Sequence, residues 1–126
     1  MICGVVTADY EAVIRLTVIG SQGQRERIEA VVDTGFDGWL SLPLSLIRDF
    51  ELPWERRARA FLADGSESIF DVHNGVILWG GKRRKVCIDA CDTTPLVGMR
   101  MLDGWELNLP VRPKHRFVIR PLPQSR

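Results

Sequence analysis

The sequence lacks long apolar runs and an excess of charge of either sign. It is also poor in cysteine and histidine, with three and two residues respectively. No apolar stretch approaches the roughly 20 residues of a membrane-spanning helix. The first ten residues lack a basic segment followed by a continuous apolar one, so we expect no signal peptide. The formal net charge of +1 gives no overall attraction to nucleic acid or anionic lipid. Three cysteines without a framework spacing favour reduced thiols in a cytoplasmic protein.

Two residue groups could be interpreted as binding sites, and neither has a strong pattern. Cys87 and Cys91 have a spacing that is atypical of zinc sites, and His73 and His115 lie far apart in the sequence. We therefore expect no metal and no cofactor. The basic run GGKRRK (80–85) is interpreted as a solvated hairpin tip, so we expect no contact with nucleic acid.

What the sequence does contain is many short stretches of alternating apolar and polar residues, within a length of 126 that suits one domain over residues 1–126. They predict strands at 12–20, 27–33 and 39–43, hairpins at 57–72 and 76–88, and closing strands at 105–111 and 116–122. Leu44, Ile47 and Phe50 recur at helical spacing after Pro43, and about one helical turn is expected after Gly98. This order predicts a small, all-β, mostly antiparallel barrel or sandwich.

The tripeptide Asp33-Thr34-Gly35 comes directly after an apolar strand, where an acid is expected to be partly buried. Thr34 offers a hydroxyl, and Gly35 offers a backbone that other groups can approach closely. These groups are suited to holding a carboxylate in a fixed position. Taken alone, the tripeptide is more typical of a turn at a strand end, where Asp and Gly are common, than of a catalytic acid.

Three motifs in order resemble those of the retropepsin-like aspartic proteases, the retroviral proteases and their bacterial relatives. They are VVDTG (31–35), the hairpin centred on Asp64-Gly65, and PLVGMRMLDG (95–104). The resemblance implies a small closed β-barrel with a flap hairpin and one or two short helices. It also implies a homodimer, because family members of this length carry one Asp-Thr-Gly motif and the reaction needs two acids.

The resemblance also implies roles for individual residues. Asp33 from each chain would form the catalytic pair, in which two carboxylates about 3 Å apart share one proton. Thr34 would brace the partner chain's loop, and Gly35 would offer its carbonyl to the substrate backbone. The segment Leu96, Val97 and Gly98 would pack under the catalytic loop and support its shape.

The sequence departs from the family pattern in two places. Phe36 stands where the family often has Ala, so we expect it to reshape a substrate pocket. Asp37 follows, and either contacts the substrate backbone or, as we favour, pairs with an arginine or belongs to a turn. The hairpin tip, with Asp64, Gly65 and Ser66, is more polar than a retroviral flap, and it is expected to contact the substrate.

The prediction from the sequence is therefore a homodimeric aspartic endopeptidase that acts on peptides or proteins. One alternative is a catalytically silent dimeric module of the same fold, which binds an extended peptide by strand addition. A second alternative is a β-barrel binding protein in which Asp-Thr-Gly is only a turn. The strands that would join the two protomers cannot be placed from the sequence.

Overall fold

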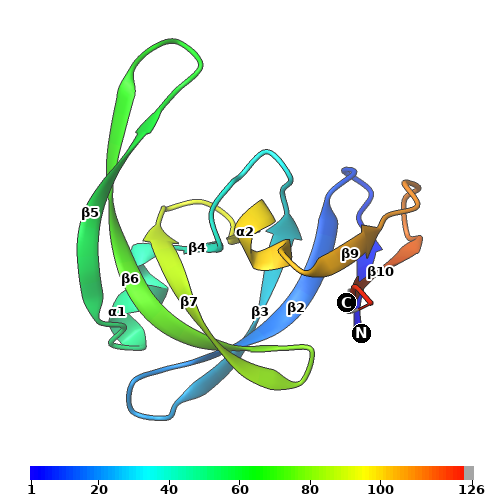
Figure 1. Cartoon of the computed structure of the whole chain (residues 1–126), viewed down its shortest axis with the longest axis horizontal. Helices are drawn as coiled ribbons and strands as arrows, with labels where there is room; N and C mark the ends of the chain where they lie inside the picture. The colour runs from blue at the N-terminus through cyan, green and yellow to red at the C-terminus, as the bar shows by residue number, and fades with distance from the viewer. Residues whose placement is uncertain (124–126) are drawn as a thin grey trace.

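The computed structural model describes residues 1–123, which form ten strands and two short helices. Figure 1 shows a curved sheet that encloses a core, with one long hairpin standing out from it. The bounds are β1 (Ile2–Val6), β2 (Ala12–Ile19), β3 (Arg25–Val32), β4 (Leu40–Leu42), α1 (Leu44–Asp49), β5 (Trp54–Phe61), β6 (Glu67–Trp79), β7 (Lys82–Ala90), β8 (Leu96–Val97), α2 (Met99–Leu102), β9 (Trp105–Asn108) and β10 (Arg116–Pro121).

The central part of the sheet is a closed ring. The strand order β6-β7-β4-β8-β3-β2 returns to its start because β2 also pairs with β6, where Val18 lies opposite Ile77. Every strand of the ring thus has a neighbour on both sides over part of its length, and this agrees with the expected barrel. Two pairs in the ring, β3–β8 and β4–β7, are parallel. The other pairings are antiparallel, including the distant pairs β1–β10, β2–β6 and β4–β8, so the expectation of a mostly antiparallel sheet is confirmed.

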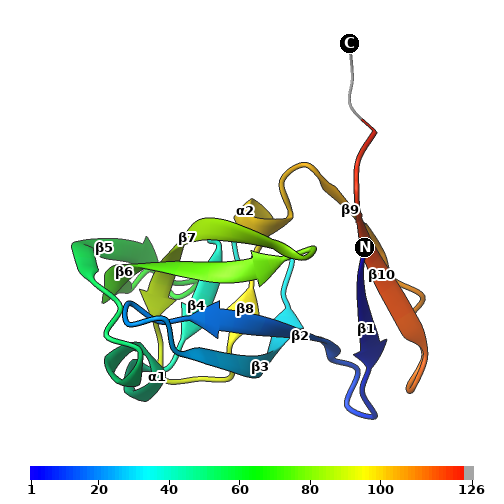
Figure 2. The same ribbon diagram turned by 90° about the horizontal axis from the view of Figure 1, so that it is seen from below.

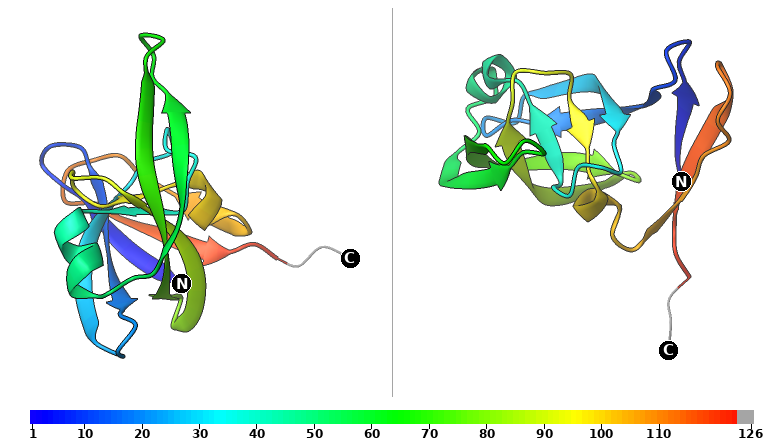
Figure 3. Two further views of the ribbon diagram at one scale, coloured as in Figure 1. Left: turned by 90° about the vertical axis from the view of Figure 1, so that its left-hand side faces the viewer. Right: turned by 90° about the horizontal axis from the view of Figure 1, so that it is seen from above.

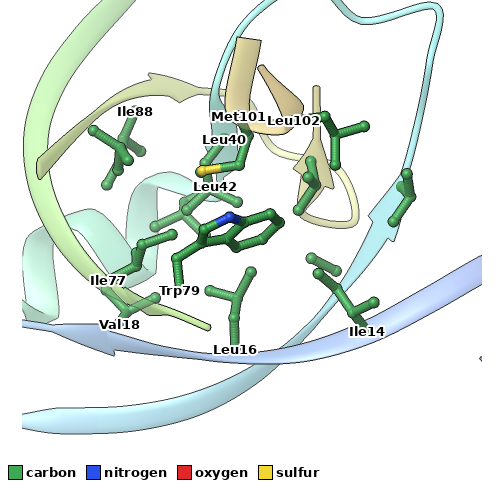
Figure 4. Packing of buried hydrophobic residues seen from close by; sticks show 14 of the residues in the cluster. Ile14, Leu16, Val18, Leu40, Leu42, Ile77, Trp79, Ile88, Met101 and Leu102 are labelled. Atoms are coloured by element: carbon green, nitrogen blue, oxygen red, sulfur yellow. The ribbon is translucent and has the colours of Figure 1, made fainter. Parts of the chain in front are cut away.

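The core lies inside the ring and follows from the alternation in the strands. Ile14, Leu16 and Val18 of β2 are buried, while Arg15 between them is exposed. Each buried side chain of this kind contributes about 1.5–3 kcal/mol through removal of apolar surface from water. Figure 4 shows the indole of Trp79 in the middle of the cluster, between side chains contributed by β2 and by α2.

Besides β5, three strands lie outside the ring: β9 and β10, which are the closing strands expected at 105–111 and 116–122, and β1, which was not predicted. β1 pairs with both β2 and β10, and β10 pairs with β9, so that they extend the sheet beyond β2. Figure 2 shows them standing apart from the ring, with the N-terminus beside β10. Strand β1 went unrecognised because its partner, β10, comes from the other end of the chain.

The hairpin of β5 and β6 extends well beyond the ring, as Figure 1 and the left view of Figure 3 show. Its turn contains Gly65, whose φ of +84° favours glycine, and Gly65 donates a backbone hydrogen bond of 2.9 Å to the Leu62 carbonyl. Strand β6 continues without interruption to Trp79, so the two hairpins expected from the sequence share one long strand. The shared strand ties the projecting hairpin to the closed ring.

The two helices are short and each follows a strand of the ring. Helix α1 begins after Pro43, as expected. It ends at Asp49, just before Glu51, whose φ of +52° is not helical. Helix α2 is a single turn after Gly98. Neither helix of residues 1–123 has the length and the apolar character needed to cross a membrane.

Candidate active site

The carboxylate of Asp33 is fixed by the backbone around it. Asp33 is the first residue after β3, it is half-buried, and its N–H donates to the Val97 carbonyl at 2.9 Å. Its Oδ1 accepts a hydrogen bond of 2.9 Å from the Gly35 N–H, and its carbonyl accepts one from Phe36. Within residues 1–123, Oδ2 has no hydrogen-bond partner. The loop therefore holds the carboxylate in place and leaves one oxygen available for chemistry.

The segment after β8 supports this loop through three backbone hydrogen bonds. Gly98 donates to the Trp39 carbonyl at 3.0 Å, Met99 to Phe36 at 2.8 Å, and Arg100 to Gly38 at 3.1 Å. Strand β8 itself lies between β3 and β4, the two strands that carry the ends of the loop. Three consecutive amide groups of one segment thus bind three carbonyl groups within residues 36–39, and this fixes the second half of the loop.

Gly98 is required because the two segments approach so closely. A methyl group on its Cα would overlap the Gly38 carbonyl and lie 2.8 Å from that of Phe36. The ring of Phe36 covers the same glycine, since the methyl would lie 2.7 Å from the ring. Phe36 therefore packs against Gly38 of its own loop and against Gly98 of the segment after β8.

A second support comes from Arg84 on β7. Its guanidinium lies 5.0 Å from the ring centre of Trp39 and 6.0 Å from that of Trp79. Its Nη1 donates a 2.7 Å hydrogen bond to the Met101 carbonyl in α2. Burial lowers the pKa of Arg84, partly opposed by the charge of Asp103. One cation thus joins β7, the end of the Asp33 loop and α2, although the basic run was expected to be a solvated tip.

The acids near the loop differ from the expectation. The ion pairs among residues 1–123 are Arg57–Asp71, Arg59–Glu67 and Arg120–Glu106, so the arginine partner expected for Asp37 does not occur there. Asp89, which the sequence did not single out, points its Oδ2 at the loop, 3.3 Å from a methyl placed on Gly38.

Burial raises the pKa of the Asp89 carboxyl, and the neighbouring charge of Asp37 adds to the rise. Arg56 and Arg100 act in the opposite direction, without either approaching within ion-pairing distance. In the sequence, the only signal for Asp89 was an acid directly after the alternating stretch 76–88. That signal does not reveal what lies beside it.

The hairpin tip stays apart from the Asp33 loop in this structure. Asp64 Oδ1 accepts hydrogen bonds from the Ser66 hydroxyl at 2.5 Å and the Ser66 N–H at 2.8 Å. These bonds hold the pKa of Asp64 below its usual value. Over residues 1–123, no hydrogen bond or ion pair joins the tip to the loop. The structure brings Asp33, Thr34, Gly35, Phe36, Asp37, Leu96, Val97 and Gly98 together and leaves Asp64, Gly65 and Ser66 at a distant tip.

Beside the loop, a groove of about 730 Å³ runs along α2 and β9. Thr34 and Asp37 line it from the loop, Met99 from α2, and Leu122 from the chain after β10. The side chains of Met99 and Leu122 are 49% and 48% exposed, so apolar surface adjoins the Thr34 hydroxyl. Exposed apolar side chains gathered around a polar group are typical of a surface that receives a partner.

The possible metal ligands and the three thiols are the remaining chemical groups of interest. No three His, Cys, Asp or Glu side chains of residues 1–123 lie close enough together to hold a metal ion. Cys3, Cys87 and Cys91 are free thiols. Burial raises the pKa of Cys87, with a further contribution from Glu55, so this thiol is a weak nucleophile at neutral pH.

The comparisons with known proteins agree with this geometry at the level of the fold. No protein-family model and no curated protein sequence matches this chain. A solved structure of a retropepsin-like aspartic protease from Rickettsia conorii is similar, with a TM-score of 0.63 over 95% of this chain and 89% of that chain. The two sequences are 15% identical, and likeness at that level speaks for the backbone arrangement. The chain is thus a closed β-structure with the fold of a retropepsin-like aspartic protease.

Proposed function

We propose that this protein is a homodimeric aspartic endopeptidase in which two Asp33 carboxylates, one from each chain, activate a water molecule. The observation that carries the proposal is the fixed Asp33 carboxylate. Its Oδ1 is held by the Gly35 N–H, and its Oδ2 has no hydrogen-bond partner among residues 1–123. The fold shared with a retropepsin-like aspartic protease supports it. In this proposal the chain is one domain, and its three free thiols favour a reducing, cytoplasmic setting.

The chemistry needs one ionised and one protonated acid. Two carboxylates within hydrogen-bond distance of each other share a single proton, because both cannot be ionised so close together. The ionised Asp33 removes a proton from water while the water oxygen attacks the peptide carbonyl carbon. The protonated partner donates its proton to the carbonyl oxygen, which gives a tetrahedral diol. Proton transfer to the nitrogen then breaks the carbon–nitrogen bond and releases an acid and an amine.

The pairing of two chains follows from the single motif. Each chain supplies one acid, so an active site of two acids needs a second copy. The groove that exposes Thr34, Met99 and Leu122 gives that copy an apolar surface beside the loop. In the proposal, the Thr34 hydroxyl bonds the partner's loop and Gly35 offers its carbonyl to the substrate. The hairpin tip with Asp64, Gly65 and Ser66 closes over the peptide.

The first test compares cleavage of a denatured protein mixture by wild type, Asp33→Asn and Asp9→Asn between about pH 3 and pH 8. Asp9 is an exposed acid in the turn after β1, so its replacement is the matched control. We expect bell-shaped activity for wild type and the control, and none for Asp33→Asn. Equal cleavage by wild type and Asp33→Asn would remove Asp33 from the chemistry. An inactive wild type would favour the silent peptide-binding module.

The second test asks whether two chains share one site. Wild type and Asp33→Asn are mixed in equal amounts at fixed total concentration and allowed to exchange subunits. If only dimers with two Asp33 residues are active, about a quarter of the wild-type activity remains, whereas independent monomers would retain about half. Sedimentation of the same samples reports the oligomeric state. A monomer with full activity would refute the dimer.

A further inference from the structure

The hairpin of β5 and β6 has one face that carries small and apolar residues. Its pairing places Ala58 opposite Phe70 and Ala60 opposite Ser68, and directly paired residues of antiparallel strands point to the same side. All four side chains are half-buried, although the hairpin projects from the ring. This face is therefore the sheltered side of the hairpin.

The other face of the hairpin carries charged pairs together with two exposed apolar side chains, Ile69 and Phe61. Arg57 pairs with Asp71 at 3.6 Å, and Arg59 pairs with Glu67 at 3.2 Å. These side chains are largely exposed, and such pairs serve mainly to keep the surface solvated. The two faces thus differ in exposure, since the second face is open to water and the first is half-buried.

The sheltered face continues from the hairpin onto the ring and ends beside the Asp33 loop. The register places Arg56, Val72 and Asp89 in one row across β5, β6 and β7, so that they share this face. Val72 is buried, and Asp89 approaches Gly38 of the loop. A chain lying along this face would pass from the small residues of the hairpin to the Asp89 carboxylate and the Asp33 loop.

Asp89 lacks a partner that would satisfy its charge. No ion pair or hydrogen bond to its carboxylate occurs among the residues that the structure describes. The raised pKa agrees with this, because burial outweighs the more distant Arg56 and Arg100. A half-buried carboxylate without a partner is destabilising, and a cation brought by a ligand would relieve it. On the loop side, the Phe36 ring occupies the space next to Gly38, 2.5 Å from where a methyl group on that glycine would lie, so the carboxylate of Asp89 faces an apolar ring there and no cation.

We propose that Asp89 selects a lysine or arginine side chain of an extended peptide, while the Ala58–Phe70 face receives an apolar side chain of the same peptide. The inference rests on the proposed function, which places such a peptide between the hairpin and the Asp33 loop. Side chains on one side of an extended chain are two residues apart, so the basic and the apolar residue occupy alternate positions.

The decisive experiment measures binding, so that it does not depend on turnover. Asp33→Asn protein is titrated with two pools of short degenerate peptides that differ at one fixed position, which is lysine in one pool and norleucine in the other. We expect the lysine pool to bind about fivefold more tightly at the preferred position. Asp33→Asn/Asp89→Asn should lose this preference, Asp33→Asn/Asp89→Glu should keep part of it, and Asp33→Asn/Asp9→Asn should keep all of it.

Cleavage gives the second readout and separates the two proposals. Sites cut by the wild type in a denatured protein mixture should be enriched in lysine and arginine at one position, and Asp89→Asn should abolish the enrichment. If both peptide pools bind Asp33→Asn equally at every position, the role of Asp89 is refuted whatever the cleavage shows. If the preference depends on Asp89 while the wild type cleaves nothing, the role of Asp89 stands and the peptidase function fails.

Discussion

Replacing Gly98 with alanine tests whether the close contact between the Asp33 loop and the segment after β8 determines the site. The backbone at Gly98 has φ −99° and ψ 177°, an extended conformation that alanine adopts without strain. The whole cost of the substitution is therefore steric. The new methyl would meet two carbonyl groups of the loop, at Phe36 and Gly38, and neither can rotate away as a flexible side chain could.

The size of the effect follows from what must move. Separating the two segments stretches the hydrogen bonds from Met99 to Phe36 and from Arg100 to Gly38, each worth about 1 kcal/mol. Overpacking adds roughly 1–3 kcal/mol. We expect the free energy of unfolding to fall by about 3 kcal/mol, which lowers Tm by roughly 12 °C for a chain of this size.

The measurement is urea unfolding and calorimetry of the variant beside a matched control, Gly81→Ala. Gly81 has open space around it and a φ of +81°, so alanine there costs about 1 kcal/mol from backbone strain alone. Gly98→Ala should lose more stability than the control, and peptide turnover should fall with it. If the two variants are equally stable, the loop is not held in the way described.

Three further outcomes are expected. Arg84→Met removes the hydrogen bond to the Met101 carbonyl and the contact with Trp39. Urea unfolding should therefore show a free energy of unfolding lower by about 2 kcal/mol. A decrease below about 0.5 kcal/mol would contradict the supporting role of Arg84. The pKa of Asp89 is raised by burial, so the contribution of Asp89 to wild-type stability should fall as pH rises from 3.8 through the folded pKa. Asp89→Asn should then have a higher Tm than wild type near pH 7 and no advantage near pH 3, and a pH-independent difference would argue against this. Gly65→Val strains a turn with φ +84°, so it should reduce peptide turnover with a Tm loss of only a few degrees; unchanged turnover would mean that the hairpin is no flap.

Much of the fold could be predicted because its signals are local. The alternation at 12–20 became β2, and the glycines at the two turns became hairpin tips. The parallel pairs β3–β8 and β4–β7 were not predictable in the same way, because their register is set by segments far apart in the sequence. The length of β6 was not predicted either, because this one strand belongs to two hairpins and pairs with β5 in one and with β7 in the other.

The same holds for the candidate site, where the local motifs could be predicted from the sequence and the contacts between distant strands could not. The segments around Asp33 and Gly98 could be identified from their residues, and the structure places them in contact. Arg84 and Asp89 could not, because each belongs to a strand whose charged residues usually face water. Arg84 instead turns to the side of Val86, towards two tryptophans, and Asp89 meets a loop that is about 50 residues away in the sequence.

The short strand β8 also bears on how the protein acquires its site during folding. Its two residues, Leu96 and Val97, pair with β3 and β4, which lie about 60 residues earlier in the chain. Contacts of such long sequence separation make folding slow, on the order of milliseconds to seconds. The Asp33 N–H has no acceptor until Val97 arrives. A chain still being synthesised, or one that has formed only its hairpins, therefore holds the Asp-Thr-Gly motif without the geometry that the finished fold gives it.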